Sequence, residues 1–244
     1  EMAIENFKER RASVDPIIGQ PEGSAVVGFS TESILQALGG SLEPLLEAIK
    51  SGAIRGVAGL VSCTTLRGSG QDVHSVAVAE ELIKRDVLIL SMGCGNAAMQ
   101  LAGLCLPEAA DKAGPGLSGL CRKLGIPPVL SYGTCTDTGR LADLLATLSS
   151  AMGGIPISDL PVVAAAPEYM EQKATIDAIF ALALGLYTYV NPVPFVTGAP
   201  RLVELLARGV EDLTGGSLHL ETDPVRAAEG MLAHIESKRE KLGI

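Results

Sequence analysis

Short apolar strands that alternate with amphipathic helices are the feature of this sequence that most limits its fold. Four continuous apolar runs predict buried strands, and each is followed by a segment whose apolar residues recur at helical spacing. These runs lie at 54–61, 87–90, 128–132 and 161–165. Such alternation requires crossover connections between parallel strands. It therefore predicts an α/β fold with a doubly wound, mainly parallel sheet and helices on both faces.

The remaining elements complete a single predicted domain over residues 1–244. A short buried strand is expected at 24–29, and weaker strands at 187–190 and 218–220. The domain as a whole is expected to contain about five or six strands. Helices are predicted at 2–11, 31–38, 42–49, 73–84, 97–104, 116–124, 140–151, 169–184, 201–208 and 225–241. We find no internal repeat and no linker.

Composition excludes several classes of protein. Hydrophobic residues make up 47% of the chain, with only 4 Phe, 4 Tyr and no Trp, so the core must be aliphatic. The net charge of −9 argues against nucleic-acid binding. No apolar run approaches the ~18 residues of a membrane helix, so no membrane insertion is expected. Five cysteines, an odd number, without an export signal favour a reducing, cytoplasmic location. The chain starts at Glu1 rather than Met, which suggests a piece of a longer protein.

Three of the five cysteines occupy equivalent places in the predicted sheet. Cys63, Cys94 and Cys135 each come shortly after the end of a predicted strand, whereas Cys105 and Cys121 do not. In an open α/β sheet, ligands bind beyond the carboxyl ends of the strands, so these three thiols are expected to gather at one edge. Converging thiolates suit a soft metal or an iron–sulfur cluster.

Other interpretations of these residues stay open. Each thiol could be a small buried hydrophobic group, although three at equivalent strand ends argue against it. Zinc ribbons need Cys-x-x-Cys pairs, and none is present. Cys63 and His74 could form a catalytic pair, but no Asn or Asp is evidently placed to orient the histidine. Gly68-x-Gly70 lacks the third glycine of a dinucleotide-binding turn, so a nucleotide-binding module is the weakest alternative.

Lys173 lies near the start of the helix predicted at 169–184. It could be an ordinary solvated lysine, or a cation that stabilises a developing carboxylate or relays a proton. A helix N-terminus already carries partial positive charge, so a lysine there is favourable when an anion is nearby. We therefore expect its ammonium to point toward the cysteines. His219 and His234 are interpreted as structural residues.

A long, ordered set of motifs carries a family resemblance. It comprises Gly-Leu-Val-Ser-Cys at 59–63, Glu-Leu-Ile-Lys-Arg-Asp-Val-Leu at 81–88, Gly-Cys at 93–94, Ile-Pro-Pro-Val-Leu at 126–130, Gly-Thr-Cys-Thr-Asp at 133–137, Ala-Pro-Glu-Tyr-Met-Glu-Gln-Lys-Ala at 166–174, and the C-terminal segment 238–244. These motifs resemble anaerobic nickel-dependent carbon monoxide dehydrogenases over nearly the whole sequence. Cys-Thr-Thr at 63–65 is similar to the dehydrogenase subunit of the bifunctional carbon monoxide dehydrogenase/acetyl-CoA synthase, where monofunctional enzymes have Cys-Asn-Asn.

The resemblance implies a Rossmann-like domain that forms the C-terminal third of a longer catalytic subunit. Carried over by motif, Cys63, Cys94 and Cys135 are ligands of a nickel–iron–sulfur cluster at a domain interface, and Lys173 is the catalytic lysine that stabilises bound CO2 or moves protons. The implied reaction is the reversible oxidation of CO with water to CO2, two protons and two electrons, in the Wood–Ljungdahl pathway of anaerobes. The implied partners are the remaining domains of the subunit, a second copy of the full subunit, and an acetyl-CoA synthase subunit.

The chain departs from the family in what it lacks. The family takes further cluster ligands, a histidine and more cysteines, from a middle domain, binds its 4Fe-4S electron-transfer clusters through N-terminal cysteines, and uses histidines for proton transfer. Cys105 and Cys121 match none of these motifs. We therefore expect the isolated chain to be inactive. The alternatives are a reductase domain like that of the hybrid-cluster proteins and a scaffold domain without a cluster.

Overall fold

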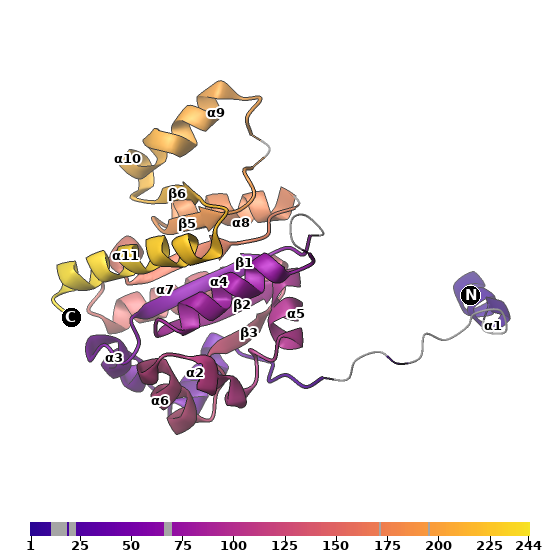
Figure 1. Cartoon of the computed structure of the whole chain (residues 1–244), viewed down its shortest axis with the longest axis horizontal. Helices are drawn as coiled ribbons and strands as arrows, with labels where there is room; N and C mark the ends of the chain where they lie inside the picture. The colour runs from indigo at the N-terminus through magenta and orange to yellow at the C-terminus, as the bar shows by residue number, and fades with distance from the viewer. Residues whose placement is uncertain (11–18, 20–22, 66–69, 171, 195) are drawn as a thin grey trace.

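Six parallel strands form one sheet at the centre of the computed structural model, which describes residues 1–10, 19, 23–65, 70–170, 172–194 and 196–244 (Figure 1). The strands are β1 Gly56–Ser62, β2 Val87–Gly93, β3 Val129–Gly133, β4 Val162–Ala166, β5 Tyr187–Val190 and β6 Ser217–Leu220. Their spatial order is β3-β2-β1-β4-β5-β6, and every neighbouring pair is parallel. The predicted doubly wound parallel sheet is confirmed. Its order reverses between β1 and β4, which is the crevice where such sheets bind ligands.

Helices cover both faces of the sheet. Their bounds are α1 Met2–Arg10, α2 Thr31–Ala37, α3 Glu43–Lys50, α4 Val73–Ile83, α5 Cys94–Leu101, α6 Pro115–Leu124, α7 Gly139–Ala151, α8 Gln172–Ala183, α9 Pro200–Glu204, α10 Val210–Thr214 and α11 Pro224–Leu242. The helices α4, α5 and α11 lie on one face, and α7 and α8 lie on the other (Figure 1). None of the helices in the described ranges is long and apolar enough to cross a lipid bilayer.

The core between these layers is aliphatic, as the composition predicts. Strand β2 is buried along its length except at its last residue, and its side chains Leu88, Ile89 and Leu90 are at most 3% exposed. Burial on both faces is typical of a central strand in a parallel sheet, and it explains why this run carries no polar alternation.

The expected buried strand at 24–29 is wrong. Only Val27 makes a bridge, to Ser131 of β3, and its side chain is 61% exposed. Gly28 follows with a φ of +89°, which interrupts the extended backbone after one bridge. Val26, Val27 and Gly28 are exposed, and only Ala25 and Phe29 of this segment pack partly against the core.

Several helix boundaries also differ from the sequence prediction. Helix α5 starts at Cys94, three residues before the predicted start, and α8 starts at Gln172, three residues after it. The backbone before α8 is held in other contacts, because the Tyr169 N–H donates to the Asn191 carbonyl. The helix predicted at 201–208 begins with α9 and continues through a π-helical turn, Leu205–Gly209, into α10.

Candidate functional site

Cys63 directly follows β1 and is fixed by the loop after β4. Its N–H donates to the Glu168 carbonyl at 2.8 Å, and its side chain is 8% exposed. The preceding Ser62 hydroxyl donates to the same carbonyl and accepts the Glu168 N–H, both at 3.1 Å. The carboxyl end of β1 is therefore clamped to the chain that leaves β4.

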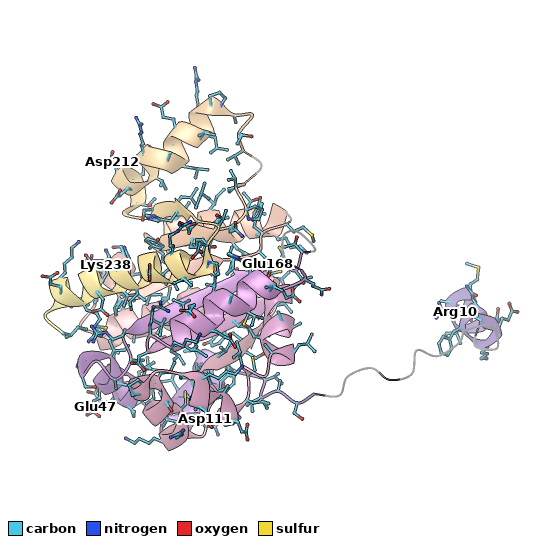
Figure 2. All side chains as sticks on the ribbon, in the orientation of Figure 1. Arg10, Glu47, Asp111, Glu168, Asp212 and Lys238 are labelled. Atoms are coloured by element: carbon cyan, nitrogen blue, oxygen red, sulfur yellow. The ribbon has the colours of Figure 1, made fainter. Side chains whose placement is uncertain are left out.

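The Glu168 side chain extends this clamp to helix α4 (Figure 2). Glu168 is only 3% exposed, and its carboxylate accepts the N–H of Ser75, the third residue of α4, at 3.1 Å. The helix N-terminus favours a negative charge, and Asp72 at the N-cap position makes no side-chain cap bond, so Glu168 supplies the missing acceptor. One residue thus ties together β1, β4 and α4.

Cys94 is the first residue of α5 and lies between two close-packed glycines. A Cβ on Gly93 would lie 2.8 Å from the Ser62 carbonyl oxygen and 3.4 Å from the Cys135 Cβ. A Cβ on Gly95 would lie 2.5 Å from the Ser62 Cβ. Gly93 also has a φ of +79°, which lets strand β2 turn at once into the helix. The two glycines allow Cys94 to approach the ends of both β1 and β3.

Cys135 opens the short 3₁₀ turn Cys135–Asp137 that follows β3, and it is half-buried. It lines one pocket together with the other two strand-end cysteines and Lys173. The pocket encloses about 250 Å³ including its open mouth, and its lining residues are Val61, Ser62, Cys63, Cys94, Cys135, Lys173, Ala174 and Asp177. The structure therefore brings together the four residues singled out from the sequence, at the carboxyl edge of the sheet.

Cys105 and Cys121 do not line this pocket. Both are fully buried in the aliphatic core, and burial raises the pKa of the Cys105 thiol to about 11 and that of Cys121 to about 12. A buried thiol of this kind stays protonated and packs as a small apolar group. The sequence interpretation that set these two cysteines apart agrees with their placement.

His74 is engaged elsewhere. Its Nε2 lies 2.8 Å from the Tyr189 hydroxyl, and that hydroxyl donates to the Glu221 carbonyl at 3.0 Å. Because the hydroxyl has one proton, His74 is the donor to Tyr189. Burial lowers the pKa of His74, which favours the neutral imidazole. His74 does not line the cysteine pocket, so the geometry does not support a pair with Cys63. The other alternative, the glycine turn that includes Gly68, lies outside the described residues.

His219 and His234, interpreted as structural, lie together around Tyr187. The His219 ring stacks on the Tyr187 ring with centroids 3.8 Å apart, and the His234 ring lies 5.0 Å from it. Burial lowers the pKa of both imidazoles. Neither lines the cysteine pocket.

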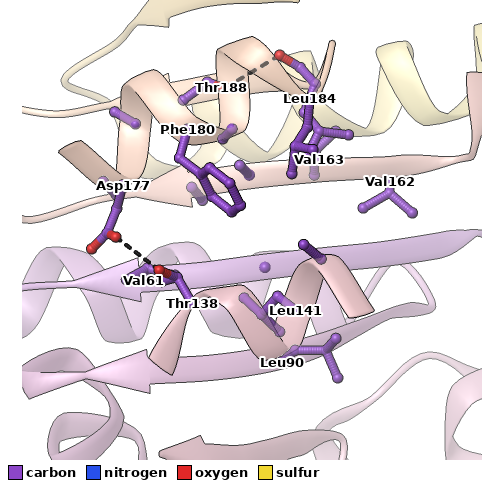
Figure 3. A pocket seen from close by; sticks show the side chains of 18 of the residues that line it. Val61, Leu90, Thr138, Leu141, Val162, Val163, Asp177, Phe180, Leu184 and Thr188 are labelled. Atoms are coloured by element: carbon purple, nitrogen blue, oxygen red, sulfur yellow. Dashed lines mark hydrogen bonds between the residues drawn. The ribbon is translucent and has the colours of Figure 1, made fainter. Parts of the chain in front are cut away.

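Asp177 is a pocket residue that sequence reasoning missed. It lies one helical turn after Lys173 on α8, and its Oδ1 accepts the Thr138 hydroxyl at 3.1 Å (Figure 3). Its Oδ2 is buried and has no hydrogen-bond partner. Burial raises the pKa of this carboxyl group. The sequence signal that could have identified Asp177 is its spacing of four residues from Lys173, because residues at that spacing share one face of a helix.

A second, apolar cavity adjoins the cysteine pocket between α7, α8 and the sheet (Figure 3). It encloses about 670 Å³ including its opening. Val61, Ala174 and Asp177 line both spaces. Apart from Asp177, no ionisable side chain lines this cavity in the described part of the chain.

The donor set of the pocket is made of thiols, a type of ligand that suits a metal–sulfur cluster. Among the described residues, no group of three or more His, Cys, Asp or Glu side chains could hold one metal ion. Thiolates that bind different metal atoms of a cluster need not converge as tightly as the ligands of one ion, and soft thiolates are the usual ligands of iron–sulfur clusters. Cys63, Cys94 and Cys135 therefore fit a multi-metal cluster as partial ligands.

The fold and pocket define this chain as an α/β domain with a thiol-lined site at the switch point of its sheet. Residues 1–225 match the Prismane/CO dehydrogenase family, and the chain belongs to that family. It is 70% identical, over all of its 244 residues, to carbon monoxide dehydrogenase 2 of Methanosarcina mazei. It is 55% identical, also over its full length, to carbon monoxide dehydrogenase of Archaeoglobus fulgidus.

Solved structures agree in fold. The nickel-free carbon monoxide dehydrogenase from Thermococcus sp. AM4 superimposes with a TM-score of 0.89 at 42% identity, covering 99% of this chain and 38% of that chain. A structure of acetyl-CoA synthase/carbon monoxide dehydrogenase with NiZn[Fe4S4] and NiNi[Fe4S4] clusters gives a TM-score of 0.89 at 33% identity, covering 99% of this chain and 38% of that chain. The present chain spans 38% to 39% of the length of the two curated relatives.

Proposed function

We propose that this chain is the C-terminal, Rossmann-like domain of an anaerobic carbon monoxide dehydrogenase subunit. In this proposal residues 1–244 form one domain, Cys63, Cys94 and Cys135 hold part of a nickel–iron–sulfur cluster, and Lys173 acts beside it. The observation that carries the proposal is the meeting of three strand-end thiols with a lysine around one pocket. Membership of the Prismane/CO dehydrogenase family supports it.

The proposed reaction is the reversible oxidation of CO with water to CO2, two protons and two electrons. When bound, the cluster would supply the metal that takes up CO and the sink for the two electrons. The protein side chains would do the rest. Lys173, in the first turn of α8, would stabilise the negative charge that develops on the substrate oxygens as CO is converted to CO2, or carry a proton away from them.

The other parts of the site and of the assembly belong to this proposal as well. The rest of the subunit would supply the remaining cluster ligands and bind further 4Fe-4S clusters for electron transfer. A second copy of the full subunit and an acetyl-CoA synthase subunit are the expected protein partners. The location would be the cytoplasm of an anaerobe, in the Wood–Ljungdahl pathway.

The test uses the full-length subunit that contains this segment, produced anaerobically with nickel and iron. Cys63→Ser, Cys94→Ser and Cys135→Ser should each lose nickel and dye-linked CO oxidation, because each removes a cluster ligand. Cys121→Ala is the matched control and should keep both, since this thiol packs in the core. Cysteine-pocket variants with wild-type metal content and turnover would refute the assignment.

Two alternatives give different results in the same experiment. A reductase domain like that of the hybrid-cluster proteins would reduce hydroxylamine and not oxidise CO. A scaffold domain would leave the nickel and iron content of the full-length subunit unchanged in all three cysteine-pocket variants. The family description includes both prismane and CO dehydrogenase proteins, so the paired assay with CO and hydroxylamine is the decisive comparison.

A further inference from the structure

The Asp177 carboxylate is the part of the pocket that the proposed function leaves without a role. One oxygen accepts the Thr138 hydroxyl at 3.1 Å, and the other is buried without a partner. Figure 3 shows Thr138 beside one oxygen and the second oxygen directed away from it. A carboxylate held on one side only is oriented but not satisfied.

A buried acceptor without a hydrogen-bond donor destabilises the protein, and more so when the group is charged. The carboxylate therefore calls for a donor in the working site. The apolar cavity on one side offers none that is charged, because its other lining residues are aliphatic apart from Phe180 and two threonines. On the other side, the ionisable groups that line the cysteine pocket are the three thiols and Lys173. Lys173 is the one cation among these lining residues.

The helix geometry places this cation within reach. Lys173 and Asp177 are four residues apart on α8, so their Cβ atoms lie about 5–6 Å apart on one face. Lysine carries its ammonium on a flexible four-carbon stem with three donors. Both residues line the same pocket, so the two side chains open onto one space.

We propose that Asp177 is a positioning residue for Lys173. The Asp177 Oδ2 accepts a hydrogen bond from the Lys173 ammonium and holds it over the three thiols, while Thr138 fixes the carboxylate. This inference rests on the proposed function for its role in turnover. The pairing offsets the unfavourable position of a lysine in the first turn of a helix. It also gives the lysine one preferred direction, toward the pocket.

A labelling experiment on the 244-residue chain tests the pairing without any cluster or activity. An ammonium held by a carboxylate reacts slowly with an acylating reagent, because it must be released first. Brief treatment with acetic anhydride at fixed pH, followed by peptide mass spectrometry, gives the acetylation of Lys173 relative to the exposed Lys50. Asp177→Asn should raise this ratio by about threefold or more, since the amide cannot pair with the charge. Asp212→Asn, at an exposed aspartate of α10, is the matched control and should leave it unchanged.

A double-mutant cycle in the full-length subunit tests the role in turnover. Asp177→Asn should lower kcat for CO oxidation by about tenfold with little change in KM for CO and none in metal content, as expected for a misplaced charge-stabilising group. In a Lys173→Ala background the same change should cost nothing further, because residues that act as a unit are not additive. Thr138→Val should give a smaller loss that also vanishes in that background, and it serves as the second variant if Asp177→Asn does not fold.

Two results would overturn the inference. The first is an unchanged acetylation ratio in both Asp177→Asn and Thr138→Val. The second is an additive cycle, in which Asp177→Asn lowers kcat as much without Lys173 as with it. If the wild-type full-length subunit does not oxidise CO, the proposed function fails, while the labelling experiment still decides whether Asp177 positions Lys173.

Discussion

Replacing Glu168 removes a buried carboxylate that joins two strands and a helix. In Glu168→Gln the side chain keeps its shape and an acceptor for the Ser75 N–H, but the charge is lost. In Glu168→Ala the acceptor is lost as well. The backbone contacts of Glu168 with Ser62 and Cys63 are open to both variants, so the pair separates the side chain from the main chain.

The size of the two effects follows from these contacts. A charge near a helix N-terminus contributes up to about 2 kcal/mol in a partly buried setting, so Glu168→Gln should lower the free energy of unfolding by about 1–2 kcal/mol. Leaving the Ser75 N–H without an acceptor adds about 1–3 kcal/mol, so Glu168→Ala should lower it by about 2–5 kcal/mol.

Equilibrium unfolding in urea measures both values, with the m-value as a check that the transition stays two-state. Amide hydrogen exchange then locates the loss, which should appear first in the opening turn of α4 and at the Cys63 amide. The control is Glu47→Gln, at an exposed position of α3, which should change the free energy of unfolding by less than about 0.5 kcal/mol.

A Glu168→Gln variant as stable as the Glu47→Gln control would refute the capping argument. So would a loss of exchange protection that spares α4. In either case the buried carboxylate would have to be explained by something other than the end of this helix.

The remaining predictions concern catalysis, pH and thiol chemistry. In the complete enzyme, Lys173→Ala should lower turnover about 10²-fold or more with metal content intact. Wild-type turnover in this variant would show that Lys173 has no catalytic role. The 244-residue chain, loaded anaerobically with iron, sulfide and nickel, should not oxidise CO, because three thiolates under-ligate the cluster; measured turnover would show otherwise. Burial lowers the pKa of His234 to about 4, below the ~6.5 of an unfolded imidazole, so its contribution to stability is present above pH ~6.5 and is lost as pH falls toward 4, by at most about 3 kcal/mol. As the pH is lowered from 7 to 4.5, the urea midpoint of unfolding should fall less steeply in His234→Gln than in the wild-type chain. Maleimide at pH 8 should label the exposed Cys94 first and leave Cys105 and Cys121 unmodified until the protein unfolds.

The apolar runs of the sequence predicted the sheet and the place of the site because both depend on local patterns. A continuous apolar run marks a buried strand, and the residue that follows it lies at the carboxyl edge. Cys63, Cys94 and Cys135 were identifiable in this way, and the structure places them around one pocket. Their roles as ligands remain predictions.

What the sequence could not supply depends on contacts between distant segments. Helix α5 begins at Cys94 because Gly93 and Gly95 pack against the end of β1, and no local signal marks that approach. Asp177 looks like an ordinary helix residue until Thr138, 39 positions away, is seen to hold it. At 24–29 the apolar pattern was present, but the chain makes a single bridge to β3 before Gly28 interrupts the extended backbone, and Val26 and Val27 stay exposed.

The clamp on Cys63 has a consequence for the order of events during synthesis. Its acceptor, Glu168, lies 105 residues further along the chain, because β4 inserts beside β1 and not beside β3. A ribosome-bound chain that ends with α7 has already emerged with all three pocket thiols, yet it has nothing to hold the first of them. Contacts this far apart in sequence close slowly. Cys63 is thus fixed in its final place only after β4 docks, so the complete pocket forms late in folding.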